Sequence, residues 1–187
     1  MSSFSIKKLI RECVKEELEK LALDQFTKSY IEVALATSDS SYIYNHGEKK
    51  SQWDTEYDED APSGEEEYGG EPLSKKYTID DIDKDTLKEI IRDCKDFQRK
   101  WREWYDAAGW SDSNAGYDFW LTRNGHGAGF WDRSSSTLFA TAFANEKGEA
   151  GIEEVREVLT NASKSYGSYS LYLGDGQYDG TIFGTKG

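Results

Sequence analysis

The longest periodic apolar pattern in the chain lies between residues 78 and 105. Its apolar side chains recur every three or four positions, the spacing that places them on one face of an α-helix. Thr78 can cap this helix, and Asp80 and Asp81 in its first turn interact favourably with the helix dipole. The apolar face comprises Leu87, Ile90, Ile91, Cys94, Phe97, Trp101, Trp104 and Tyr105. We therefore predict a domain organised around one long helix with an aromatic face.

Three other patterns of the same kind predict further helices. The first covers residues 5–21, where charged side chains fill the opposite face. Its apolar stripe consists of Ile6, Leu9, Ile10, Cys13, Val14, Leu18 and Leu21. The second runs from an N-cap at Asp24 to about Thr37, and the third runs from Ile152 to Tyr166.

The stretch at residues 116–133 is the least ordinary part of the sequence and reads GYDFWLTRNGHGAGFWDR. Strand-forming residues at 117–122 and again at 130–133 flank Asn124-Gly125, a frequent turn of β-hairpins. The glycines that follow permit a tight turn and a close approach of other backbone. This pattern predicts a glycine-kinked hairpin.

Such a hairpin would bring particular side chains together. Trp120 and Trp131 are expected to face each other across it. An ion-pair cluster is expected beside them, formed by Arg123, Asp132 and Arg133 with Asp118 able to join.

The remaining strands are predicted from apolar runs and alternation in the last third of the chain. Residues 138–144 form one apolar run, and residues 168–173 and 178–183 flank a turn-like Gly-Asp-Gly-Gln sequence. The length suits a single domain spanning residues 1–187. The predicted fold class is α+β, with N-terminal helices packed with a C-terminal antiparallel sheet that carries one inserted helix.

The negative charge is concentrated in one part of the chain. The net charge is −13, and residues 39–85 contain fifteen Asp or Glu against five Lys. Residues 38–76 lack a helical pattern, which predicts a long acidic loop or a partly disordered insertion. Its aromatic residues leave two interpretations open. The loop packs back on the domain, or it is an acidic and aromatic surface for a partner.

The acidic segment and the aromatic end of the long helix supply the candidate partner-binding residues. Those of the acidic segment are Trp53, Asp54, Glu56, Tyr57, Asp58, Glu59, Asp60, Glu65, Glu66 and Glu67. The end of the long helix adds Trp101, Trp104 and Trp110, because Trp and Tyr dominate the energetics of many protein interfaces. The alternative for these three tryptophans is a place in the core.

Composition excludes several classes of function. An acidic protein repels nucleic acid, so we expect a basic protein partner rather than direct DNA or RNA binding. Only two histidines are present, and Cys13 and Cys94 lie on apolar helix faces, so no metal centre and no cofactor are expected. No apolar run is long enough to cross a membrane, and we expect a cytoplasmic protein.

Residues 116–133 also permit a catalytic interpretation. His126 can act as a general base oriented by Asp132 or Asp118. The glycines, however, match neither a P-loop nor a dinucleotide fingerprint, and no nucleophile elbow is present. We do not expect an enzyme from this pattern.

The run from Tyr117 to Arg133 resembles a signature of small phage-encoded proteins that carries no established catalytic role. In that family the signature follows an acidic spacer and a helix like residues 87–97, and a helix like 152–166 and a hairpin like 169–176 come after it. The signature residues here are Trp120, Arg123, Asn124, His126, Trp131, Asp132 and Arg133. This chain departs from the family at residues 134–147 and in its long 38–76 segment.

Among small acidic phage proteins, the chain most resembles type II anti-CRISPR inhibitors of Cas9. The resemblance implies an inhibitor that binds a host DNA-targeting nuclease in the host cytoplasm. Cas9, in its free or guide-loaded form, is the first candidate. Two alternatives stay open at this point. One is a small hydrolase or nucleotide-handling enzyme that uses His126 and Asp132. The other is an accessory phage structural or interaction protein.

Overall fold

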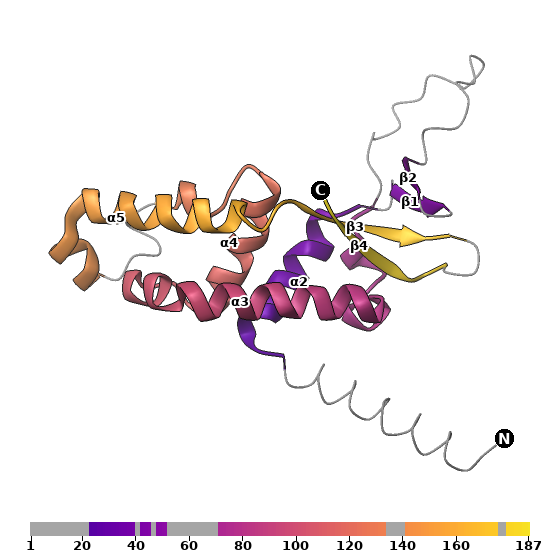
Figure 1. The fold of residues 1–187 in the computed structure, drawn as a ribbon, viewed down its shortest axis with the longest axis horizontal. Coiled ribbons are helices and arrows are strands. Elements are labelled where there is room, and N and C mark those ends of the chain that lie inside the picture. The colour runs from indigo at the N-terminus through magenta and orange to yellow at the C-terminus, as the bar shows by residue number, and fades with distance from the viewer. Residues whose placement is uncertain (1–22, 40–41, 46–47, 52–70, 134–140, 176–178) are drawn as a thin grey trace, which may run out of the picture.

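The computed structural model describes residues 23–39, 42–45, 48–51, 71–133, 141–175 and 179–187 (Figure 1). The predicted helix at residues 5–21 lies outside these ranges. The helix α3 (Lys84–Ala108) lies along the long axis of the view in Figure 1, with α5 (Thr141–Lys164) beside one half of it and the sheet towards its other end. The α+β class is confirmed, with helices packed with a C-terminal antiparallel strand pair.

The long helix α3 begins later than its sequence pattern suggests. Asp83 is its N-cap and accepts hydrogen bonds from the backbone N–H groups of Asp85 and Thr86, both at 3.0 Å. Thr78 instead caps a short 3-10 helix, η2 (Ile79–Asp81). The acidic residues after Thr78 therefore belong to a separate turn. The predicted apolar face of α3 lies in or against the core from Leu87 onward, with the exception of Trp104, which is exposed.

The core is assembled where α2 (Gln25–Thr37) and α4 (Asp112–Asn124) meet α3. Asp24 is the predicted N-cap of α2 and accepts from the N–H of Thr27 at 2.8 Å. Phe26, Phe97 and Phe119, one from each helix, are fully buried, and the rings of Phe97 and Phe119 are 4.2 Å apart. Such aromatic pairs stabilise a core beyond the area they bury.

The predicted hairpin at residues 117–133 is wrong. Residues 117–122 belong to α4, and Phe130–Asp132 form a 3-10 helix, η3. Gly125 ends α4 in the left-handed conformation (φ 67°), so Asn124-Gly125 serves as a helix C-cap instead of a hairpin turn. Because every residue from 118 to 123 is buried, whether polar or apolar, this part of α4 shows no alternation of polar and apolar positions that would reveal its helical period.

The tryptophans of this stretch consequently do not face each other. Trp120 is buried, and its ring lies edge-on to Tyr30 at 5.2 Å. Trp131 is 49% exposed on η3. The separation arises because a helix directs Trp120 towards α2, whereas η3 directs Trp131 to solvent.

The sheet has four strands in the order β2-β1-β3-β4. β3 (Tyr169–Gly174) and β4 (Ile182–Lys186) form the expected antiparallel pair, although β4 covers 182–186 in place of the predicted 178–183. β1 (Tyr42–Asn45) and β2 (Glu48–Ser51) form a second antiparallel pair, and β1 runs parallel to β3.

The 38–76 segment thus contains more regular structure than its composition predicts. Two of the four strands come from it, and η1 (Leu73–Lys75) places Leu73 in the core. Residues 52–70 lie outside the described ranges. β1 pairs locally with β2, but it joins the rest of the sheet through β3, which lies more than 120 residues away in the sequence.

The helix α5 replaces part of a predicted strand. Residues 141–144, the described part of the 138–144 run, are helical. The backbone leaves helical geometry at Gly148 (φ 64°, ψ −170°), which divides α5 into two segments. The second segment confirms the predicted helix from Ile152, which packs against α3 with Ile152 and Leu159 buried.

The closest approach of α2 and α4 predicts the effect of one substitution. A Cβ at Gly116 would lie 2.1 Å from the carbonyl oxygen of Phe26, and backbone cannot yield as a side-chain end can. Gly116→Ala should lower the free energy of unfolding by about 2–3 kcal/mol, despite its better helix propensity. Chemical denaturation measures the change. Asn114→Ala, at an exposed position of the same helix, should change it by less than about 0.5 kcal/mol.

Candidate functional site

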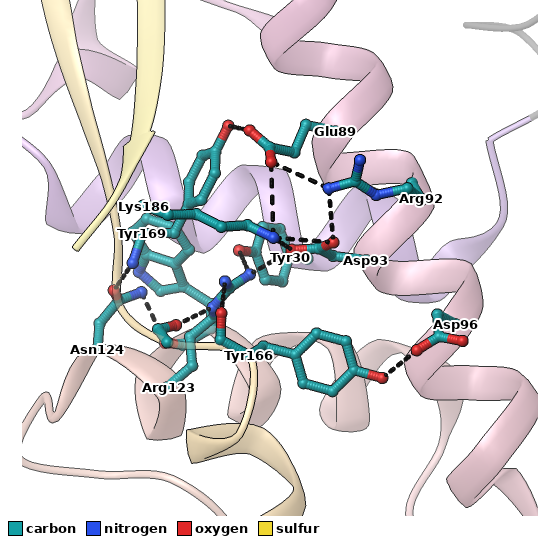
Figure 2. Close-up of polar contacts among 12 residues, drawn as sticks. Tyr30, Glu89, Arg92, Asp93, Asp96, Arg123, Asn124, Tyr166, Tyr169 and Lys186 are labelled. Carbon is teal, nitrogen blue, oxygen red and sulfur yellow. Dashed lines mark hydrogen bonds and ion pairs between the residues drawn. The ribbon is translucent and has the colours of Figure 1, made fainter.

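Arg123 of α4 is the centre of the largest buried polar cluster (Figure 2). Its side chain is completely covered. Nη1 donates to the hydroxyl of Tyr30 at 2.8 Å and lies 3.4 Å from Oδ2 of Asp93. Nε and Nη2 donate to the carbonyls of Gly167 and Tyr166 at 2.9 and 3.0 Å. One side chain therefore joins α2, α3 and the C-terminal end of α5.

Aromatic rings complete the surroundings of this guanidinium. Its carbon lies 5.3 Å from the ring centre of Tyr169 and 5.4 Å from that of Phe119. The ring of Tyr166 lies at 6.0 Å. A buried cation is stabilised by such faces because the π-electrons carry negative charge.

The cluster continues from Asp93 to the surface along α3. Nζ of Lys186 from β4 lies 3.0 Å from Oδ2 of Asp93 and 3.5 Å from Glu89. Arg92 pairs with the same two carboxylates, and the hydroxyl of Tyr169 donates to Glu89 at 3.1 Å (Figure 2). The two acids are thus shared between the sheet and the helix.

The ionisation of the tyrosines in this cluster is strongly suppressed. Burial raises the pKa of Tyr30 well above its usual 10. Burial, followed by the nearby Glu89, raises the pKa of Tyr169. Burial and the hydrogen bond to Asp96 raise the pKa of Tyr166, whose hydroxyl lies 2.7 Å from that carboxylate. The tyrosines of this cluster are therefore neutral near pH 7.

Asn124 extends the connection from α4 to the sheet. Its amide nitrogen donates to the carbonyl of Trp120 at 3.0 Å, and its Oδ1 accepts from the N–H of Tyr169 at 2.7 Å. The signature residues Arg123 and Asn124 therefore hold β3 against the helical core.

A second buried cluster fixes the segment after α4. Asp118 is fully buried and receives hydrogen bonds from the guanidinium of Arg133 and, at 2.9 Å, from Nε1 of Trp110. Burial raises the pKa of Asp118, and these two donors oppose the rise. Asp132 accepts from the N–H of Gly129 at 2.9 Å.

The predicted cluster of Arg123, Asp132 and Arg133 is therefore corrected. Asp118 does pair with Arg133, as expected. Arg123 points elsewhere, because five residues along a helix place it on a different face from Asp118. Asp132 forms a local turn instead of a shared ion pair.

His126 is half-buried at the other side of α4. Its ring is stacked 6.3 Å from that of Trp120, and burial alone lowers its pKa. It lines a cavity of about 220 Å³ together with Asp39, Asn124, Ser168 and Ser170. Neither proposed orienting group serves it, since Asp118 is bound to Arg133 and Asp132 to Gly129. The expected acid–base pair is not formed.

The three tryptophans in and just after the end of α3 differ in how far they are buried. Trp110 is 2% exposed and belongs to the core, which corrects its assignment as a partner-binding residue. Trp101 is half-buried against the core, and Trp104 is 36% exposed. The candidate residues between Trp53 and Glu67 lie outside the described ranges.

Trp104 lies at a groove of about 210 Å³ between α3 and α5. Ala107 and Val155 supply apolar surface, and Glu103 and Glu154 supply carboxylates. Lys147, also at the groove, pairs with Glu146 at 2.9 Å. Glu103 forms no ion pair with any described residue. An aromatic ring flanked by carboxylates can bind a cationic side chain.

Sequence reasoning missed the partners of Arg123. Asp93 could have been noticed, because it lies three residues after Ile90 and so falls on the apolar face of α3. Tyr30 and the carbonyls of residues 166 and 167 carry no comparable signal, since only tertiary packing brings them to Arg123.

Within the described residues, no group of three or more His, Cys, Asp or Glu side chains could hold a metal ion. None of the helices in this part of the chain combines the length and apolar character needed to cross a membrane. Comparison with protein-family models, curated proteins and solved structures finds no match.

The buried charge of Arg123 predicts a large effect of its removal. Arg123→Met leaves two buried carbonyls without their donor and removes the buried cation beside Asp93, so it should lower the free energy of unfolding by about 3–5 kcal/mol. Denaturant unfolding is the measurement. Arg92→Met is the matched control, because that side chain is 65% exposed, and it should cost less than about 1 kcal/mol. Similar losses in the two variants would contradict the central role of Arg123.

The burial of His126 predicts a pH effect. We expect its pKa in the folded protein to lie below about 6.5, the unperturbed value. The folded state then binds fewer protons than the unfolded chain, so its stability is lost as the pH falls below about 6.5. NMR titration gives the pKa, and His126→Gln identifies the resonance against that of His46. A value at or above the unperturbed one would contradict the effect of burial.

Proposed function

We propose that this protein is a non-catalytic binding protein that inhibits a DNA-targeting nuclease of a host cell, with Cas9 as the first candidate. Its place of action would be the host cytoplasm. The resemblance of residues 117–133 to small phage proteins, and of the chain to type II anti-CRISPR inhibitors, suggests the partner class. The groove at Trp104 is the observation that supports a binding role.

The distribution of polar groups favours binding over catalysis. Arg123, Asp93 and Asp118 are buried. Arg123 pairs with Asp93, and Asp118 pairs with Arg133, so these charges serve the fold. Among the described residues, no carboxylate pairs with His126 to make it a stronger base. The hydrolase alternative loses its expected residue pair, and nothing in the described residues replaces it.

The chemistry of the partner follows from the groove and the net charge. Trp104 presents an aromatic face, and Glu103 and Glu154 can meet the charge of an inserted Lys or Arg. With a net charge of −13, the protein would be attracted to basic protein surfaces and repelled by nucleic acid. Cas9 presents such surfaces, because it holds its guide–target duplex in a positively charged channel.

A cleavage assay with guide-loaded Cas9 tests the proposal directly. The purified protein is titrated at low and moderate salt, and binding of target DNA is followed in parallel. Inhibition at near-stoichiometric amounts is expected, and the DNA-binding measurement identifies whether recognition or a later step is blocked. Absence of inhibition across several Cas9 orthologues would reject Cas9 as the partner.

Variants of the groove test the proposed contact. Trp104→Ala should weaken inhibition about 10–30-fold, the loss typical of an interface hot spot. Trp131→Ala is the matched control, since Trp131 is another exposed tryptophan and lies outside the groove. Equal effects of the two substitutions would rule out the Trp104 groove as the contact.

The acidic segment is tested separately by charge neutralisation. The substituted residues are Asp58, Glu59, Asp60, Glu65, Glu66 and Glu67. We expect weaker binding with a reduced dependence on salt, because these carboxylates would steer a basic partner. Unchanged affinity would exclude a major role of the segment and leave the contact to the Trp104 groove.

A further inference from the structure

An apolar groove lies along α2, away from the groove at Trp104. It has a volume of about 410 Å³ and runs between α2 and the segment that contains η1 and η2. Leu23, Ile31, Leu35, Tyr77 and Ile79 provide most of its lining. Leu23 precedes α2, Ile31 lies in its middle and Leu35 near its end, so the groove follows the helix for most of its length.

A groove of this kind favours an apolar occupant, because covering its lining removes apolar surface from water. The sequence supplies a segment with a matching surface. Residues 5–21 carry seven apolar side chains at helical spacing, and the segment ends two residues before Leu23. Such a stripe needs a partner surface to be buried.

The length and direction of the chain permit this occupancy. Seventeen helical residues span about 25 Å, and the thirteen residues of α2 span about 20 Å. Asp24 begins α2 as its N-cap, which leaves residues 22–24 as the connection. Connections of two to five residues commonly join antiparallel helices. The short tether also gives the segment a high effective concentration at the groove.

The charges at the groove fit an antiparallel arrangement. Folding back at residues 22–24 would bring the Glu-rich end of the segment, residues 16–19, beside Lys28. The same register would bring Arg11 and Lys15 beside Glu32. Lys28 and Glu32 are both exposed and have no ion pair with a described residue. Opposite charges therefore meet at both positions.

We infer that residues 5–21 bind the α2 groove within the same chain, as a helix antiparallel to α2. The occupied groove is then part of the protein's own fold, and a partner of the protein binds elsewhere. This inference does not depend on the proposed inhibition of a nuclease.

Disulfide trapping in the full-length chain tests the inference. Cys13 lies on the apolar stripe, and the antiparallel register places it at the level of Glu32. Glu32→Cys is oxidised with oxidised glutathione, and the linked peptides are identified by mass after digestion. We expect an intramolecular disulfide between residues 13 and 32, formed at the same rate over a tenfold range of protein concentration.

Three control variants fix the interpretation. Lys28→Cys lies one helical turn further from Cys13 and should form the disulfide at least tenfold more slowly. Lys88→Cys, at an exposed position of α3, should form none, and Cys13→Ser should abolish the product. Cys94 is buried and does not compete.

Two results would overturn the inference. Absence of a disulfide to Cys13 from both α2 positions, under oxidation that fully links the same cysteines in the unfolded chain, would exclude the intramolecular helix. Disulfide-linked dimers whose yield rises with protein concentration would show that the segment of a second copy occupies the groove.

Discussion

Arg123 brings a positive charge into the interior, and the arrangement of the helices and the sheet depends on how that charge is neutralised. A buried guanidinium is costly unless its donors are all bound and an anion is near. Asp93 provides the anion, and Tyr30 and two carbonyls accept three further hydrogen bonds. These partners come from three different elements, so their positions are fixed relative to one another. The aromatic core formed by α2, α3 and α4 surrounds this point.

The second buried charge, that of Asp118, is also compensated by an opposite charge and a hydrogen-bond donor. Asp118 is covered completely, and Arg133 and Trp110 hold it from either side of the glycine-rich segment. Arg133 thereby anchors the chain after η3, and its carbonyl in turn accepts from Arg156 of α5. The unusual composition of residues 116–133 is thus explained by two buried ion pairs and a helix end. None of this requires a catalytic role.

Polar groups that are buried in the two ion-pair clusters cannot contact a partner protein. A partner must therefore bind at surfaces outside these clusters. The Trp104 groove combines exposed aromatic surface with carboxylates and stands apart from both buried clusters. The α2 groove is more apolar and adjoins residues 5–21, which favours an occupant from the same chain. The two grooves therefore differ in chemistry as well as place, and the experiments on them are independent.

Local signals in the sequence determined the N-cap of α2, the apolar face of α3, the helix from Ile152 and the β3–β4 pair, because each depends on neighbouring residues. Tertiary structure alone decided the rest. The strand-forming residues of 117–122 became the buried helix α4, since packing on α2 outweighed their intrinsic preference. The partners of Arg123 lie 30 to 93 residues away, and β1 pairs with a strand still more distant. Contacts over such separations leave no periodic trace in a sequence, so the clusters that hold this fold together could be recognised only in the folded chain.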